Sequence, residues 1–260
     1  MTLAVVQFIK FVKKAMKNWI SFITGFIVLL FIYHFPEFFE SFWITAVFKT
    51  GFLAVAVILS RLQGWKFLEG FGLSLTGNWY RLLFAGLLAG IVSFTLSIIL
   101  SVGLNFEKLE SAETVSFFLK SLPLISVMTF FPSIAEDILT RGYLYAHLKF
   151  LKPAAWVFLS AFVYVLNHIW RLNEGLPVLT YLFLLGLVLG FCIYMYKSLW
   201  LAFGIHWGAN IVFELSNQGL KLTDIGNQNA STWTLASVWG LVLAMLIFIK
   251  RNSLKGYSLK

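Results

Sequence analysis

The chain has 260 residues, of which 60% are hydrophobic and only 12% are charged, whereas about 25% of the residues of a soluble domain are charged. This composition excludes a soluble globular domain and indicates an integral membrane protein. The apolar runs are long and do not alternate with a period of two, which favours helices over a β-barrel. The net charge of +9 does not indicate nucleic-acid binding, because the basic residues lie at the ends of the apolar runs, where anionic lipid headgroups attract them.

The chain begins with a basic, partly amphipathic segment, residues 1–18, which we expect to lie in the membrane interface. Eight apolar runs follow, each near the roughly 20 residues that a helix needs to cross a bilayer. They are Trp19–Phe35, Phe42–Ser60, Leu82–Leu104, Leu122–Leu148, Pro153–Trp170, Pro177–Tyr196, Leu199–Leu215 and Trp233–Ile249. The predicted fold is therefore all-α: a polytopic protein of about eight transmembrane helices, with one transmembrane domain over residues 19–250 and a basic tail over residues 251–260.

Two of the eight runs are irregular, and one contains a cysteine. Lys49 falls inside the second run, from where its long side chain can reach the interface. The fourth run is over-long and contains Pro132, at which we expect a kink or a break. Cys192, the only cysteine, excludes an intramolecular disulfide and a cysteine-based metal cluster.

The charges between the runs alternate along the chain. Lysines and arginines precede the first run and follow the second, fourth, sixth and eighth runs, whereas the other loops are mainly acidic. The positive-inside rule therefore places both termini in the cytoplasm. The expected location is a bacterial cytoplasmic membrane.

Ionisable side chains inside the fourth run are the strongest sign of a functional site. Glu136, Asp137 and Arg141 lie within six positions, and each charge at the centre of a span costs about 2.5–3.5 kcal/mol on insertion-based scales. Asp137 and Arg141 are four positions apart and are expected to pair. A purely structural alternative is that Ser133 and Glu136 form a capping box for a helix that restarts after Pro132.

Three other polar residues are predicted to reach the depth of Glu136. His168 and Glu136 each lie 16 positions from Lys152, in the turn between the fourth and fifth runs, so an antiparallel helix pair places them at equal depth. The sixth and seventh runs turn at about Ser198 on the same side of the membrane. Counted from that turn, His206 lies at a depth of about 12 Å and Asn210 at about 18 Å, on one helix face. Each histidine alone is also consistent with a core residue, but their convergence indicates a site.

These residue types suit the hydrolysis of an amide. Glu136, helped by His168, is suited to deprotonate a water molecule that attacks a carbonyl. His206 and Asn210 are suited to donate hydrogen bonds to the oxyanion that forms. Such a site needs no serine or cysteine nucleophile, and we expect neither a cofactor nor a metal.

The motifs resemble those of the CPBP intramembrane peptidases, the CAAX proteases and bacteriocin-processing enzymes that are also called the Abi family. The resemblance covers roughly residues 121–217 and rests on three motifs in the same order and spacing. Glu136-Asp137-x-x-x-Arg141 is similar to E-E-x-x-x-R, Tyr164-x-x-x-His168 to F-x-x-x-H, and His206-x-x-x-Asn210 to H-x-x-x-N/D.

The resemblance implies an eight-span fold with a four-helix catalytic core and a metal-free glutamic peptidase activity. It implies Glu136 as the water-activating base, His168 as its helper, and an oxyanion site formed by His206 and Asn210. Two supporting positions depart from the family pattern. Asp137, which acts with Arg141, replaces a glutamate, and Tyr164 replaces a phenylalanine.

Several alternatives stay open at the level of the sequence. A zinc-dependent membrane protease would use Glu136, His168 and His206 as ligands. A transporter or proton relay would also place carboxylates and histidines inside the membrane, and a non-enzymatic role in bacteriocin immunity or partner binding is known in the wider family. For the peptidase, the expected substrate is a membrane protein or a lipid-modified, CAAX-type peptide in the bilayer, without nucleic acid. The oligomeric state is not predicted.

Overall fold

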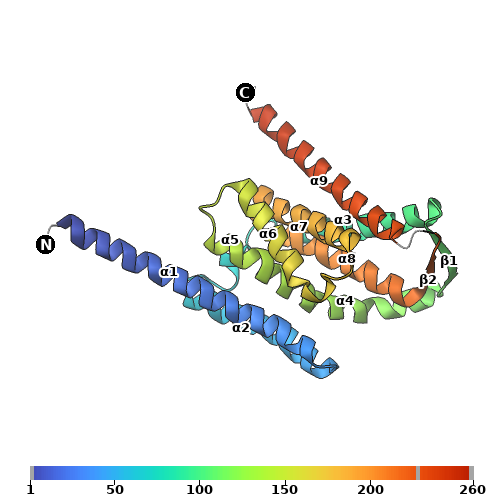
Figure 1. The fold of residues 1–260 in the computed structure, drawn as a ribbon, viewed down its shortest axis with the longest axis horizontal. Coiled ribbons are helices and arrows are strands. Elements are labelled where there is room, and N and C mark those ends of the chain that lie inside the picture. Colours follow the sequence, from blue (N-terminus) through green and yellow to red (C-terminus); the bar gives the residue numbers. More distant parts are fainter. Residues whose placement is uncertain (1–2, 227–228, 258–260) are drawn as a thin grey trace. The chain divides into compact units, whose positions relative to one another are not determined.

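Helices make up most of the structure. The computed structural model describes residues 3–226 and 229–257, which form helices and one small antiparallel sheet (Figure 1). This confirms the predicted all-α polytopic class. The elements are α1 (Leu3–His34), η1 (Phe35–Phe38), α2 (Phe42–Leu62), η2 (Glu69–Phe71), α3 (Trp79–Gly103), β1 (Glu107–Ala112), α4 (Val115–Asp137), η3 (Ile138–Gly142), α5 (Tyr143–His147), α6 (Pro153–Asn167), η4 (Ile169–Arg171), α7 (Leu176–Tyr196), α8 (Trp200–Gly219), β2 (Leu220–Asp224) and α9 (Ala230–Tyr257).

Each of the eight predicted spans coincides with a helix. Six segments of the described residues are long and apolar enough to cross a membrane: Asn18–Phe38, Phe42–Leu62, Trp79–Gly103, Val115–His147, Leu176–Tyr196 and Ala230–Asn252. The other two predicted spans correspond to α6, which has only 15 residues, and to α8, which carries His206, Asn210 and Glu214. The chain is thus an integral membrane protein, and its short helix and its polar helix both contribute candidate site residues.

The predicted terminal segments continue the first and last helices, α1 and α9. The predicted interfacial segment, residues 1–18, is continuous with the first span in α1, apart from residues 1–2, which lie outside the described residues. The predicted tail, residues 251–260, continues α9 as far as Tyr257, and residues 258–260 again lie outside. Whether these ends lie in the interface and in the cytoplasm stays a prediction.

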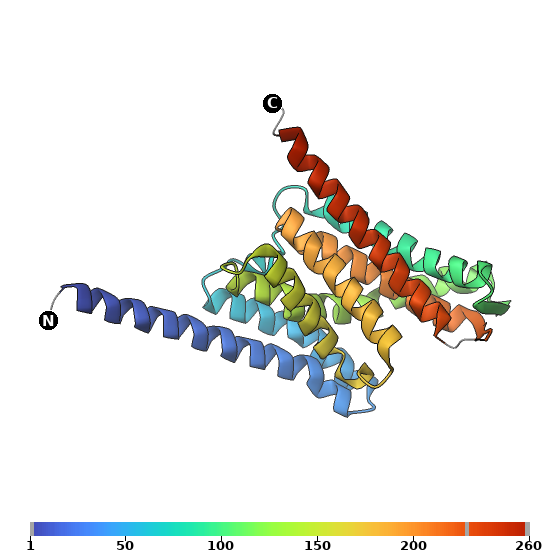
Figure 2. The same ribbon diagram turned by 45° about the horizontal axis from the view of Figure 1, so that its top comes forward.

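The chain forms two compact units, Met1–Gly70 and Phe71–Lys260. In the first unit α1 and α2 run antiparallel and are joined by η1 (Figures 1 and 2). In the second unit α8 packs against α3, α4 and α7, and α7 also packs against α6 and α9. One membrane domain over residues 19–250 stays a prediction.

Lys49 is buried inside the first unit. Its Nζ donates to the Tyr33 carbonyl at 2.8 Å, lies 3.4 Å from Glu37 Oε1, and sits 3.2 Å from the centre of the Tyr33 ring. A carbonyl, a carboxylate and an aromatic face together compensate an ammonium group that has left water. The charge in the second predicted span is therefore satisfied within the unit.

The fourth predicted span does not break at Pro132. Helix α4 continues through this proline to Asp137, and the irregularity lies at η3, a π-helical turn over Ile138–Gly142. Proline is tolerated in a membrane helix because neighbouring helices and Ser or Thr hydroxyls satisfy the backbone groups that it frees. At the wide turn, the Thr140 hydroxyl donates to the Glu136 carbonyl at 2.8 Å, so the widened turn lies directly beside the candidate carboxylates.

Glycines bring α3 and α8 into direct backbone contact. A Cβ at Gly86 or Gly90 of α3 would overlap backbone atoms of α8, and a Cβ at Gly204 or Gly208 of α8 would overlap backbone atoms of α3. Both pairs have the spacing of four that allows membrane helices to approach closely. This packing holds the segment of α8 that carries His206.

A two-stranded sheet closes one end of the second unit. Strand β1 follows α3, strand β2 follows α8, and they pair antiparallel with Glu107 opposite Asp224 and an irregularity between Leu109 and Ser111. We did not predict these strands, because both are short and mostly exposed and therefore lack the alternating apolar pattern of a half-buried strand.

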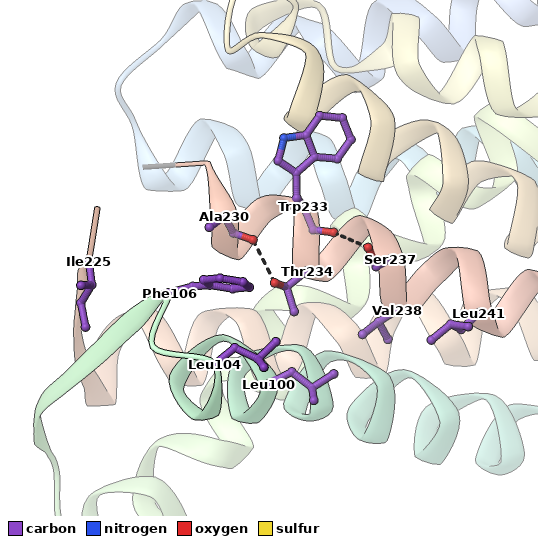
Figure 3. Close-up of a pocket in the computed structure, with 10 residues that line it drawn as sticks. All are labelled: Leu100, Leu104, Phe106, Ile225, Ala230, Trp233, Thr234, Ser237, Val238 and Leu241. Carbon is purple, nitrogen blue, oxygen red and sulfur yellow. Dashed lines mark hydrogen bonds between the residues drawn. The ribbon is translucent and has the colours of Figure 1, made fainter. Parts of the chain in front are cut away.

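An apolar pocket of about 620 Å³ lies between α3, α9 and the sheet (Figure 3). Two hydroxyls in its lining bond to their own helix: Thr234 donates to the Ala230 carbonyl at 2.9 Å, and Ser237 donates to the Trp233 carbonyl at 2.8 Å. The surface that this pocket presents is consequently mainly hydrocarbon.

Candidate active site

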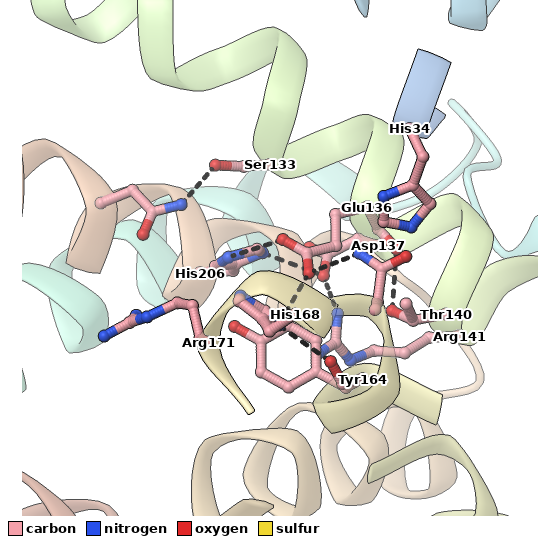
Figure 4. Close-up of polar contacts among 12 residues, drawn as sticks. His34, Ser133, Glu136, Asp137, Thr140, Arg141, Tyr164, His168, Arg171 and His206 are labelled. Atoms are coloured by element: carbon pink, nitrogen blue, oxygen red, sulfur yellow. Dashed lines mark hydrogen bonds and ion pairs between the residues drawn. The ribbon is translucent and has the colours of Figure 1, made fainter. Parts of the chain in front are cut away.

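The structure brings one carboxylate and two imidazoles together inside the second unit (Figure 4). Glu136 lies in the last turn of α4 and is 6% exposed. His168 Nδ1 lies 3.5 Å from its Oε1, and His206 Nε2 lies 3.7 Å from its Oε2. Helices α4 and α8 and the C-terminal end of α6 thus meet at this carboxylate.

His168 does not lie inside a helix, as the predicted span to Trp170 implied. Helix α6 ends at Asn167, and His168 occupies the C-cap position. Its Nδ1 lies 2.9 Å from the Tyr164 carbonyl, one of the helix-end carbonyls that have no partner within the helix. Because both neighbours of Nδ1, this carbonyl and the Glu136 carboxylate, are acceptors, Nδ1 carries the proton.

Asn167 is a site residue that the sequence analysis missed. Its Nδ2 donates to Glu136 Oε1 at 3.0 Å, and the side chain is 7% exposed. In a continuous helix, neighbours such as Asn167 and His168 point about 100° apart. The end of α6 between them lets both side chains turn to Glu136. The only signal in the sequence was the position of Asn167 next to a candidate histidine.

Asp137 and Arg141 form the predicted ion pair, and both side chains are fully buried. Asp137 Oδ1 also accepts a hydrogen bond from His206 Nδ1 at 3.1 Å, which directs His206 Nε2 toward Glu136. The Arg141 guanidinium lies over the Tyr164 ring, 4.3 Å from its centre. The pair therefore orients an imidazole, and Tyr164 supports the arginine with the face of its ring.

Asn210 lines the same cavity, but its amide group is turned to Ser133. Its Nδ2 donates to Ser133 Oγ at 2.9 Å, and the side chain is half-buried. This contact replaces the capping box that we considered for Ser133 and Glu136, because α4 does not restart after Pro132 and has no N-terminus there. A water molecule or a substrate would compete with Ser133 for the Asn210 amide.

The cavity has a volume of about 100 Å³ and receives side chains from α3, α4, α6, η4, α7, α8 and α9. Its lining residues are Phe94, Glu136, Tyr164, His168, Arg171, Tyr181, Leu182, Leu185, His206, Ala209, Asn210, Phe213 and Trp239. The space is sufficient for water, and polar side chains from several elements face it beside apolar ones. Cavities of this kind are typical of sites that admit water to a dry interior.

Arg171 and Tyr181 are further lining residues that the sequence analysis did not select. The Arg171 guanidinium donates to Glu174 at 2.8 and 3.0 Å and also to the Tyr181 hydroxyl. The bonds from Arg171 lower the pKa of Glu174 below its usual range. A cation is thus held at the end of the cavity where η4 leaves α6.

Among residues 3–226 and 229–257, no group of three His, Cys, Asp or Glu side chains is arranged to hold a metal ion. The donors around Glu136 are instead engaged with protein groups: His206 Nδ1 with Asp137, and His168 Nδ1 with a backbone carbonyl. The arrangement that these contacts produce is a carboxylate whose two oxygens each face an imidazole.

Comparison with known proteins finds one family model that is similar to this region. Residues 118–212 match the family model described as Rce1-like, type II CAAX prenyl endopeptidase. The match covers most of α4 through most of α8, including Glu136, Asn167, His168 and His206, and it confirms the resemblance to the CPBP, or Abi, family. No curated protein and no solved structure shows a significant match to the chain.

Proposed function

We propose that this protein is an intramembrane glutamic endopeptidase, which hydrolyses a peptide bond of a membrane-associated or lipid-modified, CAAX-type substrate with water activated by Glu136. The observation that carries the proposal is the meeting of Glu136, His168 and His206 around a small cavity inside an Rce1-like domain. Asn210, which lines the same cavity, is the fourth proposed catalytic residue.

Glu136 is the proposed base. Its carboxylate takes a proton from a water molecule in the cavity, and the hydroxide adds to the carbonyl carbon of the peptide. The C–N bond then breaks as the protonated Glu136 returns the proton to the leaving amine. Asn167 and His168 both donate toward Oε1 of this carboxylate, which supports one fixed orientation of the base.

His206 and Asn210 are the proposed donors to the oxyanion. His206 Nδ1 is engaged with Asp137 Oδ1, which leaves Nε2 directed toward Glu136 and the cavity. Asn210 adds its amide when the substrate oxygen replaces Ser133 as the acceptor, and each such donor is worth about 100- to 1,000-fold in rate.

The test uses purified protein in liposomes with a prenylated CAAX-type peptide and an unmodified peptide. We expect Glu136→Gln and His206→Ala each to lower cleavage by at least about 100-fold. Glu214→Gln is the matched control, since this glutamate lies on α8 but does not line the cavity. Unchanged cleavage in both site variants rules out the proposal.

The natural substrate can be sought by comparing the membrane proteomes of cells that carry wild-type protein or Glu136→Gln. Uncleaved precursors should accumulate only with the variant. The same variant separates the alternative functions. Solute flux that depends on Glu136 in proteoliposomes would favour a transporter, and protection from a bacteriocin that survives Glu136→Gln would favour a non-enzymatic role.

A zinc mechanism gives a different result in the same preparation. A zinc enzyme would hold a stoichiometric metal when active and would lose cleavage in a chelator. The glutamate mechanism predicts cleavage that survives the chelator in protein without bound zinc.

A further inference from the structure

A second pocket, of about 190 Å³, lies between the catalytic cavity and the β1–β2 sheet. Its polar lining residues include Ser97, Ser101, Glu107, Ser216, Asn217 and Thr232. They come from α3, β1, α8 and α9, all of which belong to the second unit. The mechanism proposed above uses none of them.

Two phenylalanines separate this pocket from the catalytic cavity. Phe94 of α3 and Phe213 of α8 line both spaces, and their rings meet edge to face with centroids 5.9 Å apart. Along α8, the residues lining the two spaces run from His206 through Phe213 to Asn217, toward the sheet. The two spaces therefore lie in line, with the phenylalanine pair between them.

The hydroxyls beside the phenylalanine pair present hydrogen-bond acceptors. Ser97 donates to the Phe94 carbonyl at 2.7 Å, and Ser216 donates to the Phe213 carbonyl at 2.8 Å. Each hydroxyl hydrogen is thus used within its own helix, and the oxygen lone pairs remain to accept. Acceptors of this kind suit the N–H groups of a peptide strand, whereas a hydrocarbon chain gains nothing from them.

Glu107 adds a carboxylate at the sheet end of the pocket. Burial, and then the facing Asp224, raise the pKa of Glu107, which a hydrogen bond from Ser101 partly offsets. The pocket thus carries polar groups from the phenylalanine pair to the sheet, alongside the apolar Ile98, Leu222 and Leu235. The apolar pocket of about 620 Å³ in Figure 3 shares no lining residue with it or with the catalytic cavity.

We propose that this pocket is the binding site and entry path for the polypeptide segment of the substrate, and that Phe94 and Phe213 form a door between it and the catalytic residues. The inference rests on the proposed peptidase function. The catalytic cavity, at about 100 Å³, is large enough for water but too narrow for a peptide strand, so the strand enters when the two rings turn aside. The substrate backbone donates its N–H groups to the acceptors of the pocket.

The test uses single cysteine variants in the full-length protein in liposomes. Ser97→Cys and Asn217→Cys place a thiol in the pocket on two different helices. Ser93→Cys is the matched control, because Ser93 is as buried as Ser97 and lies one turn away on α3, yet lines none of the pockets described above. The native Cys192 is buried, and wild-type protein controls for it.

The reagent is a charged, water-soluble methanethiosulfonate. We expect it to modify Ser97→Cys and Asn217→Cys at least about tenfold faster than Ser93→Cys, since access governs thiol modification. The bulky adduct should lower kcat/KM for peptide cleavage by about tenfold or more relative to the same variant before modification. A peptide substrate present during the reaction should slow the modification.

The outcomes separate the two proposals. If wild-type protein cleaves no peptide, the peptidase function fails and the entry path fails with it. If wild-type protein cleaves but the modified Ser97→Cys and Asn217→Cys proteins cleave at their unmodified rates, only the entry path is overturned. Equal modification of Ser93→Cys and Ser97→Cys would overturn it as well.

Discussion

The two units of the molecule bury charge in two different ways. In the first unit Lys49 is compensated locally by the Tyr33 carbonyl, the Tyr33 ring and Glu37. In the second unit Glu136 faces a cavity, and buried atoms of Asp137 and Arg141 have no hydrogen-bond partner among the described residues. Both charges lie in segments that are long and apolar enough to cross a membrane.

The difference teaches how to read a charge inside a membrane helix. A charge that is saturated by its neighbours stabilises a helix pair and has nothing left to offer a substrate. A charged group with unsatisfied hydrogen-bonding atoms near a cavity raises the free energy of the folded state. Such unsatisfied groups are expected at functional sites.

The largest effect is expected from Asp137→Asn compared with Lys49→Met. Asp137→Asn removes the charge that orients His206 and leaves Arg141 uncompensated, so cleavage should fall by about 100-fold. Lys49→Met replaces a locally satisfied charge by an apolar side chain of similar length, and cleavage should stay within about threefold of wild type. Steady-state kinetics on both proteins measure the contrast, and an equal loss in the two would erase the distinction between the units.

Asn167→Ala should have the next largest effect. It removes the hydrogen bond to Glu136 Oε1, and a bond to a charged group contributes about 1.5–3 kcal/mol, so kcat should fall by about tenfold or more. KM should change little, because Asn167 acts through Glu136 and does not line the cavity. A variant that loses only affinity would show that Asn167 binds the substrate instead.

Gly90→Ala and Gly51→Ala compare the packing of the two units. The added methyl at Gly90 would overlap the α8 backbone, whereas at Gly51 of α2 nothing among the described residues lies within 4 Å. Gly90→Ala should destabilise the protein by about 1–3 kcal/mol, and Gly51→Ala should leave stability equal or higher. Thermal unfolding in detergent measures both, and cleavage by Gly90→Ala should fall because α8 carries His206.

The smallest effect is expected from Glu174→Gln at the edge of the cavity. Arg171 lowers the pKa of Glu174. Glu174 is therefore fully ionised and paired above the usual glutamate pKa, and the ion pair is lost only as the pH falls through the lowered pKa. Both side chains are partly exposed, and such pairs contribute little. Between pH 6 and about 8, cleavage by Glu174→Gln should stay within about threefold of wild type. A larger loss would mean that Arg171 must be held in place for the reaction.

Much of the helical plan could be predicted because it depends on local composition. A helix in lipid must satisfy its own backbone and needs about 20 apolar residues to cross, so the helices fell where the hydropathy placed them. We expected a kink or a break at Pro132, and the helix does not break there because a helix in a packed membrane protein tolerates a proline. The π-helical turn at η3 could not be predicted, because no residue pattern in the sequence indicates it.

The sequence by itself determined which polar groups the membrane would have to accommodate and, through spacing from the turns, their approximate depth. Only the tertiary structure decided what each group faces. The early end of α6 turned Asn167 together with His168 toward Glu136. The glycine contact with α3 holds the segment of α8 that carries His206, and Asn210 turned to Ser133. The depth of a side chain depends on how many residues separate it from the membrane surface. The group that it faces depends on where its helix ends and how closely the neighbouring helix approaches, and both are properties of the packed chain.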